Sequence, residues 1–243
     1  MKKLIALALL VAGQVAAWGQ TVNIHMKDGS VLQYDASGVD YVNFSAGNND
    51  GLNGHEAVDL GLPSGTKWAT CNVGASTPEE AGYFFAWGEV AVKEDYSWAT
   101  YKWSVNGSDS NFSKYPKGNN GILEPADDAA HVWWGGSWRM PTSEDAQELL
   151  DNCQKVMVTQ NDKKGLRLTG PNGNTLFLPA SGYYDGKTLT NGVNRGYYWL
   201  SDQVKGDTRA YNLAVRWDAL QKPQAVDYSR RFAGMNIRAV IKE

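Results

Sequence analysis

The stretch from His131 to Cys153 constrains the fold of this chain more than any other part of it. Its first half sets the bulky rings of residues 133–138 around Gly135 and Gly136, and glycine lets a backbone pass close to such rings. Its second half begins with Thr142, a residue type favoured at helix N-caps. Apolar residues then recur with the spacing of one helical face, namely Ala146, Leu149, Leu150 and Cys153. The sequence therefore predicts a helix from Thr142 that turns this face toward the core.

Most of the remaining chain shows short strand patterns. The 243 residues include 26 Gly, 12 Tyr and 10 Trp, a composition that favours short strands, tight turns and bulky anchors. The segments 165–169 and 175–178 flank a Gly-Pro-Asn-Gly-Asn turn, which predicts a hairpin. Further strands are expected at 66–73, 83–88, 196–202, 210–217 and 230–241.

Two more short helical segments are expected before the stretch at 131–153. Thr77 suits an N-cap, Pro78 suits the first helical position, and Glu80 completes a capping box, so a helix is predicted that ends at Gly82. The segment 125–130 is expected to form a helical turn with acidic residues at its start.

The N-terminus has the pattern of an export signal. Lys2 and Lys3 precede the apolar run 4–13, which is too short to cross a bilayer, and Val15-Ala16-Ala17 fits a cleavage site. We predict that residues 1–19 are a signal peptide and that the protein is secreted, whether to the periplasm, the medium or the cell surface. No later apolar run is long enough to predict a transmembrane segment.

A small module is expected between the leader and the main domain. Apolar and polar residues alternate over 22–27, Asp28-Gly29 is a turn signal, and 31–34 suits the return strand, so residues 20–46 are predicted to be an N-terminal β-hairpin segment. A third short strand is expected at 41–44. The Gly- and Asn-rich run 47–54 predicts a linker, and the main domain is expected to span 55–243.

The chain has two cysteines, Cys71 and Cys153. In an oxidising compartment an even pair is most simply explained by a disulfide, which would join the strand at 66–73 to the predicted helix. Two buried free thiols are the alternative.

The long polar segment 89–121 is the predicted binding site. It sets aromatic rings among amide and carboxylate side chains, and a flat ring suits the apolar face of a sugar while the polar groups suit its hydroxyls. Loops of this length often carry function. The candidate ligand-binding residues are Trp98, Tyr101, Trp103, Asn106 and Asp109. In the alternative interpretation, these rings only anchor the loop to the core.

Other functional classes find little support in the sequence. The net charge of −3 argues against nucleic acid as a partner. Asp127 and Asp128 are adjacent, so they would diverge on a helix rather than form a catalytic pair, and His131 suits a structural role better than a catalytic one. We predict no catalytic residues, no metal ligands and no cofactor.

Several sequence blocks together resemble the Fibrobacter succinogenes major paralogous domain family of exported bacterial proteins. The resemblance covers about residues 55–243, and the segment 20–46 resembles the short β segment that precedes such domains in Bacteroidota surface proteins. The blocks come in this order: Val58–Leu62, Lys67–Ala75, Phe85–Glu89, Asp127–Ala130, Trp134–Thr142, Phe177–Tyr183, Tyr198–Ser201 and Gly234–Val240.

The resemblance implies an α+β fold of the C-type lectin-like kind, with loop-rich antiparallel sheets and two short helices. The resemblance assigns no functional residues, and the sequence lacks the motifs with which such lectins bind sugars through calcium. We expect an exported module that binds glycan or protein through aromatic loops. A structural or adhesive surface component is the first alternative. An oxidase similar to formylglycine-generating enzymes is the second, although no cysteine follows Cys153 to serve it.

Overall fold

A computed structural model of the chain describes residues 21–25, 31–35, 52–117, 121–192, 194–217 and 224–242. The predicted leader 1–19, the turn at 28–29, the third strand at 41–44 and residues 47–51 of the predicted linker lie outside the described residues. The chain divides into two compact units, Met1–Asn43 and Phe44–Glu243, and each is described by itself.

The described part of the first unit is an antiparallel hairpin. Its strands are β1 (Thr21–His25) and β2 (Val31–Asp35), and their register pairs Thr21 with Asp35 and Ile24 with Leu32. The alternating pattern therefore predicted both strands of this segment correctly.

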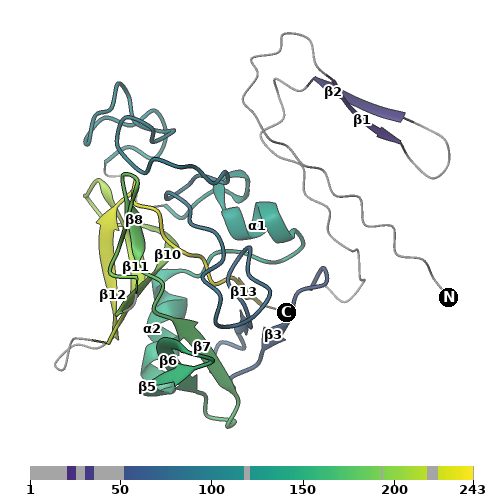
Figure 1. Cartoon of the computed structure of the whole chain (residues 1–243), viewed down its shortest axis with the longest axis vertical. Coiled ribbons are helices and arrows are strands. Elements are labelled where there is room, and N and C mark those ends of the chain that lie inside the picture. Colours follow the sequence, from purple (N-terminus) through teal and green to yellow (C-terminus); the bar gives the residue numbers. More distant parts are fainter. Residues whose placement is uncertain are drawn as a thin grey trace. The chain divides into compact units, whose positions relative to one another are not determined.

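The described residues of the second unit form four antiparallel sheets and two α-helices (Figure 1). The sheets have the strand orders β13-β4-β3, β5-β6-β7, β8-β9 and β10-β11-β12. Its elements are β3 (Ala57–Val58), β4 (Lys67–Ala69), the 3-10 turn η2 (Pro125–Asp127), α1 (Ala129–Trp134), α2 (Ser143–Asn152), β5 (Gln154–Gln160), β6 (Lys163–Thr169), β7 (Thr175–Pro179), β8 (Tyr183–Asp185), β9 (Thr188–Thr190), β10 (Arg195–Gln203), β11 (Arg209–Arg216), β12 (Gln224–Arg230) and β13 (Val240–Ile241).

The helix α2 forms as its sequence predicts. The Thr142 side chain accepts a hydrogen bond from Asp145 N, and the Asp145 carboxylate accepts one from Thr142 N, so both ends of a capping box are present. Ala146, Leu149 and Leu150 are buried on its apolar face, which lies against the sheet β10–β12. The predicted hairpin of β6 and β7 is also confirmed, with the turn at residues 170–174.

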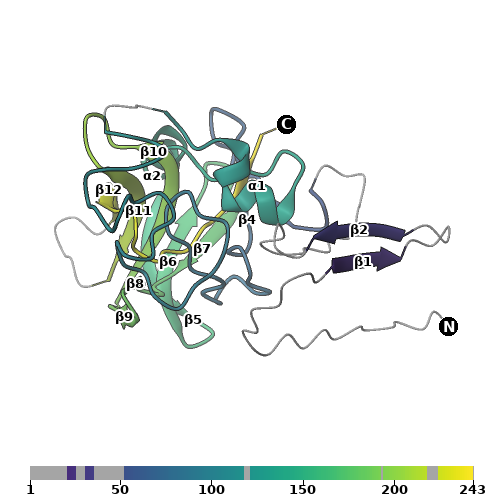
Figure 2. The same ribbon diagram turned by 90° about the horizontal axis from the view of Figure 1, so that it is seen from above.

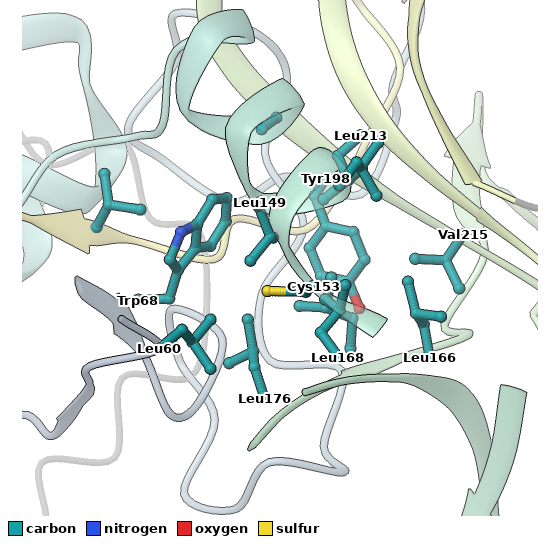
Figure 3. Packing of buried hydrophobic residues seen from close by; sticks show 14 of the residues in the cluster. Leu60, Trp68, Leu149, Cys153, Leu166, Leu168, Leu176, Tyr198, Leu213 and Val215 are labelled. Atoms are coloured by element: carbon teal, nitrogen blue, oxygen red, sulfur yellow. The ribbon is translucent and has the colours of Figure 1, made fainter. Parts of the chain in front are cut away.

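The core of the second unit lies between α2 and two of the sheets (Figures 2 and 3). It is a single cluster to which α2, β6, β7, β10 and β11 all contribute apolar side chains. The central members are Leu60, Trp68, Leu149, Cys153, Leu166, Leu168, Leu176, Tyr198, Leu213 and Val215 (Figure 3). At Gly170 the chain comes so close that a Cβ would lie 2.1 Å from the Leu60 carbonyl oxygen, so the β6–β7 turn needs glycine there.

The C-terminal segment 231–241 ties these elements together, and all of its residues are buried. It forms single bridges from Met235 to Phe85, from Asn236 to Tyr198 and from Val240 to Arg139, besides the pairing of β13 with β4. Residues far apart in the sequence therefore share this one segment as a partner.

Arg238 is one of the fully buried polar residues of that segment. Its side chain has no exposed surface, and Nε donates to Asn72 Oδ1 at 2.8 Å while Nη1 donates to Thr70 O at 2.8 Å and Ala69 O at 3.1 Å. Burial lowers the pKa of this guanidinium to about 10. The arginine thus fixes the chain after β4 against the C-terminal segment.

The expected C-type lectin-like fold is wrong. The structure is mostly antiparallel β-sheet, with 38% strand and 10% helix. Two short helices are present, but the described strands of the second unit form separate sheets of two or three strands each. The strands therefore do not join into the one compact sheet that the resemblance implied.

The helix predicted after Thr77 does not form either. Glu80 does accept a hydrogen bond from Ser76 N at 2.7 Å, as a cap would. However, the carbonyl of Ala81 accepts bonds from the side-chain amides of Asn72 and Asn236, and Tyr83 N donates to the Val73 carbonyl. These tertiary bonds use the backbone groups that a helix would need, and the segment forms turns instead.

The predicted disulfide between Cys71 and Cys153 is also wrong, because both cysteines are free and too far apart to be bonded. Cys153 caps α2 inside the core cluster that contains Trp68. Cys71 follows Trp68 by three residues, up to about 10 Å further along the chain. There it lies beside Thr70 Oγ1 and close to Arg238, outside the apolar cluster.

We predict that alkylation of the unreduced protein will modify two thiols at different rates. Cys71 is half-buried, whereas Cys153 is buried and its burial raises its thiol pKa, so Cys71 should react first in the native state. Mass spectrometry after alkylation in denaturant, with and without prior reduction, should give the same mass. A mass that changes on reduction would contradict the two free thiols.

We predict that Arg238→Met will destabilise the second unit by about 3 kcal/mol or more, because hydrogen bonds from a charged donor contribute about 1.5–3 kcal/mol each and their buried acceptors would lose their partner. Urea unfolding followed by tryptophan fluorescence measures the change. Arg167→Met, at an exposed position of β6, is the control and should change stability by less than about 0.5 kcal/mol. Equal stability of the two variants would contradict the role assigned to Arg238.

Candidate functional site

The aromatic rings of the predicted binding loop are used for packing. The Trp98 ring lies 4.9 Å from Phe232, 5.6 Å from Phe112 and 5.7 Å from Tyr101, measured between ring centroids. Tyr101 is buried, and its hydroxyl donates to the Trp87 carbonyl at 2.8 Å. Burial raises the pKa of this hydroxyl well above its usual value, as befits a phenol that serves as a fixed donor.

The loop is wrapped around a buried guanidinium group. Arg231 has no exposed surface, and its Cζ lies 4.9 Å from the Trp87 ring centroid and 4.7 Å from that of Phe112. Its Nη1 donates to the Tyr115 carbonyl at 2.6 Å. Rings that face a buried cation in this way stabilise it through their quadrupoles. The aromatic residues thus form part of the core around Arg231.

The other predicted residues of the loop do not converge on one point with these rings. Trp103 Nε1 donates to the Gly88 carbonyl at 2.9 Å, and its ring meets Tyr115 edge-on at 6.1 Å. Asn106 and Asp109 are exposed, with Asn106 in a turn at φ 53°. None of the five lines the hollows described below, and binding by this loop stays a prediction.

A hollow of about 390 Å³ lies over the sheet β10–β12, and we call it the arginine–tyrosine hollow. Residues of β8, β10, β11, β12 and the C-terminal segment line it. Its lining residues are Arg195, Tyr197, Arg216, Asp227, Ser229, Arg230, Tyr183, Asp185, Phe232, Ala233 and Met235.

Strand alternation separates the core face of this sheet from the face that bears the hollow. Side chains point to opposite faces at successive positions, so Leu213 and Val215 of β11 enter the core while Ala214 faces the other way. Ala214 is the register partner of Tyr197 on β10, so the Tyr197 side chain starts from this second face. Ala214 itself is buried there, and Tyr197 is part of the lining.

Aromatic residues form the walls. The Tyr183 and Tyr197 rings meet edge-on at 5.1 Å, and Phe232 is a buried residue of the same lining. Burial raises the pKa of Tyr183; Asp185 and Tyr197 act in the same direction, while Arg195 and Arg230 lower it. Tyr183 therefore lies within the electrostatic reach of Asp185, Arg195 and Arg230.

Charged groups complete the rim. Arg216 forms an ion pair with Asp227, whose other oxygen accepts a hydrogen bond from Tyr228 N at 2.9 Å. Arg195 is the register partner of Arg216 across β10 and β11, so the two side chains start from neighbouring positions on one face. The hollow thus offers guanidinium, carboxylate, phenol and hydroxyl groups around an aromatic interior.

A second hollow, of about 400 Å³, includes His131 of the stretch discussed above and is lined also by Asp128 and Ser201. Asp128 accepts hydrogen bonds from His131 N and Met140 N, and burial raises its pKa. The His131 ring bonds to the Trp138 carbonyl, and the buried Ser201 hydroxyl has no partner among the described residues. These contacts do not join the three residues into a proton relay.

A third hollow is lined by Phe84, Tyr96 and Tyr184 together with Lys93 and Lys187. The Tyr184 ring stacks on Tyr96 at 5.6 Å and meets Phe84 edge-on at 4.9 Å, so these rings hold one another in place.

Two further features are absent from the described residues. Among them, no group of three or more His, Cys, Asp or Glu side chains is placed to hold a metal ion. None of the helices in the described part of the chain is both long and apolar enough to cross a membrane.

Comparison of the chain with family models, with curated proteins and with solved structures finds no match. The family resemblance seen in the sequence stays a prediction.

The sequence did not identify the arginine–tyrosine hollow. It did indicate the strands at 196–202 and 210–217. Residues 197–200 form a continuous aromatic and apolar run, which predicts a buried strand but does not distinguish its two faces. The pairing of β12 with β11, which brings Asp227 to Arg216, could not be derived from local patterns.

We predict that Tyr101→Phe will lower stability by about 1–3 kcal/mol, because the buried Trp87 carbonyl would lose its donor. Asp109→Ala, in the exposed part of the same loop, is the control and should change stability by less than about 0.5 kcal/mol. Urea unfolding measures both. If Tyr101→Phe is as stable as the control, the anchoring role of the loop is refuted.

Proposed function

We propose that this protein is an exported, non-catalytic module that binds glycan in the arginine–tyrosine hollow. The observation that carries the proposal is a hollow whose lining combines aromatic rings with guanidinium, carboxylate and hydroxyl groups. Its place of action outside the cytoplasm rests on the predicted leader 1–19. Membership of the Fibrobacter major paralogous domain family is part of the same proposal and rests on the sequence blocks alone.

The chemistry of the lining suits a sugar. A pyranose ring presents apolar C–H faces, which can pack against Tyr183, Tyr197 or Phe232, and hydroxyl groups, which can bind carboxylates and guanidiniums. Tyrosine supplies both an apolar body and a polar tip. The volume of about 390 Å³ also lies within the range of about 300–1,000 Å³ that is usual for small-molecule sites.

The same lining argues against hydrolysis of the bound sugar. Glycoside hydrolysis requires two carboxyl groups, one of which gives a proton to the leaving oxygen. Asp185 and Asp227 are the carboxyl groups in the lining, and Asp227 already accepts hydrogen bonds from Arg216 and from Tyr228 N. Binding without turnover therefore fits these groups better than catalysis does.

We predict that the full-length protein will bind a subset of glycans saturably on a glycan array. Tyr183→Ala should weaken the binding about tenfold, which corresponds to about 1.4 kcal/mol, because it removes one wall of the hollow. Isothermal titration with a glycan identified on the array measures the change.

Tyr228→Ala is the matched control. Tyr228 lies on β12 next to Asp227 but is 46% exposed, is not part of the lining and faces the Arg209 side chain. Its loss should leave glycan affinity unchanged. An array without any binding, or equal loss in both tyrosine variants, would refute the proposed site and favour a structural or adhesive surface role.

A further inference from the structure

We infer that the glycan bound in the arginine–tyrosine hollow carries an acidic group, either a carboxylate or a sulfate. This inference rests on the proposed function and specifies the substrate class of the same site. It follows from the kinds of charge around the hollow and from the geometry of the groups that carry them.

The charges in the lining differ in sign from those of the whole chain. The chain has a net charge of −3 at neutral pH. The lining nevertheless contains three arginines, Arg195, Arg216 and Arg230, against the two carboxylates Asp185 and Asp227. A hollow with an excess of positive charge in an acidic protein attracts anions locally.

The strand register brings two of these arginines close together. Arg195 and Arg216 are directly opposite each other on β10 and β11, so both side chains start from one face of the sheet. Arg216 also forms an ion pair with Asp227, another residue of the lining. Two guanidinium groups that start from neighbouring positions can bind the same acidic group of a ligand.

The geometry of the polar groups suits an oxyanion. A guanidinium presents parallel N–H donors that match the two oxygens of a carboxylate or sulfate. Arg230 is exposed at the end of β12 and close enough to affect the Tyr183 hydroxyl. Since burial raises the pKa of Tyr183, this phenol stays protonated at neutral pH and can donate to the same oxyanion.

The test compares three soluble polymers with the full-length protein by isothermal titration: polygalacturonate, chondroitin sulfate and dextran. We expect at least one of the two acidic polymers to bind at least about tenfold more tightly than neutral dextran. We also expect this binding to weaken when ionic strength rises from about 0.05 M to about 0.5 M, because salt screens exposed charges. Preference for polygalacturonate identifies a carboxylate, and preference for chondroitin sulfate a sulfate.

Charge variants locate the effect. Arg195→Gln and Arg230→Gln should each weaken binding of the acidic polymer about five- to tenfold, and Arg195→Lys should restore part of the loss because it keeps the charge but not the planar donors. Arg167→Gln removes the same charge from an exposed position on β6, in another sheet, and should leave binding unchanged.

The outcomes separate this inference from the proposed function. A neutral glycan could bind as tightly as the acidic polymers, with binding that Tyr183→Ala abolishes and that both glutamine variants leave unchanged. In that case the inference of an acidic ligand is wrong, whereas the proposed glycan site stands. If Arg167→Gln weakens the acidic polymers as much as Arg195→Gln and Arg230→Gln do, the attraction is a property of the whole surface and the inference fails. If no glycan of either kind binds, the proposed function and this inference both fail.

Discussion

Two buried guanidinium groups in the C-terminal segment are the constraint on which the second unit depends. Arg231 and Arg238 have no exposed surface, and their partners are carbonyl oxygens, an amide oxygen and aromatic rings rather than carboxylates. Removing a charge from water costs several kcal/mol even after relaxation. The surrounding chain must therefore offer aligned acceptors and ring faces, which fixes segments such as 69–72 and 112–115 in one arrangement.

This constraint explains the aromatic composition without reference to a ligand. The rings of Trp87 and Phe112 face Arg231, and Tyr101 and Trp98 pack around them in turn. A cation–π contact in a desolvated place can contribute about 2 kcal/mol, so a long irregular loop gains order from a cation supplied by a distant part of the sequence. Aromatic residues among Asn and Asp suggested sugar chemistry, yet in this loop most of the rings stabilise the fold.

Local signals allowed part of the fold to be predicted. The alternation over 22–25, the turn at 170–174 and the cap at Thr142 each act within a few residues, and the corresponding strands and α2 are present. Distances between residues far apart in the sequence could not be predicted from such local signals. The inward direction of Cys153 was predicted correctly, but the position of Cys71 depends on Arg238, which binds the chain after β4 outside the apolar cluster. The helix expected after Thr77 failed for a similar reason, since Asn72 and Asn236 take the Ala81 carbonyl.

The candidate site also depends on both local and long-range effects. The core needs Leu213 and Val215 on one face of β11, and strand alternation then leaves Ala214 on the other face whether or not a ligand exists. This face differs from the core face in the residues that the register and the C-terminal segment place at its hollow: Tyr197 and Arg195 from β10, Asp227 from β12, and Phe232 from the C-terminal segment. Core packing fixes which residues of these strands face inward, but it does not require that guanidinium, carboxylate and phenol groups meet on the other face. That combination of groups around aromatic rings is the part of the arrangement that binding explains better than folding does.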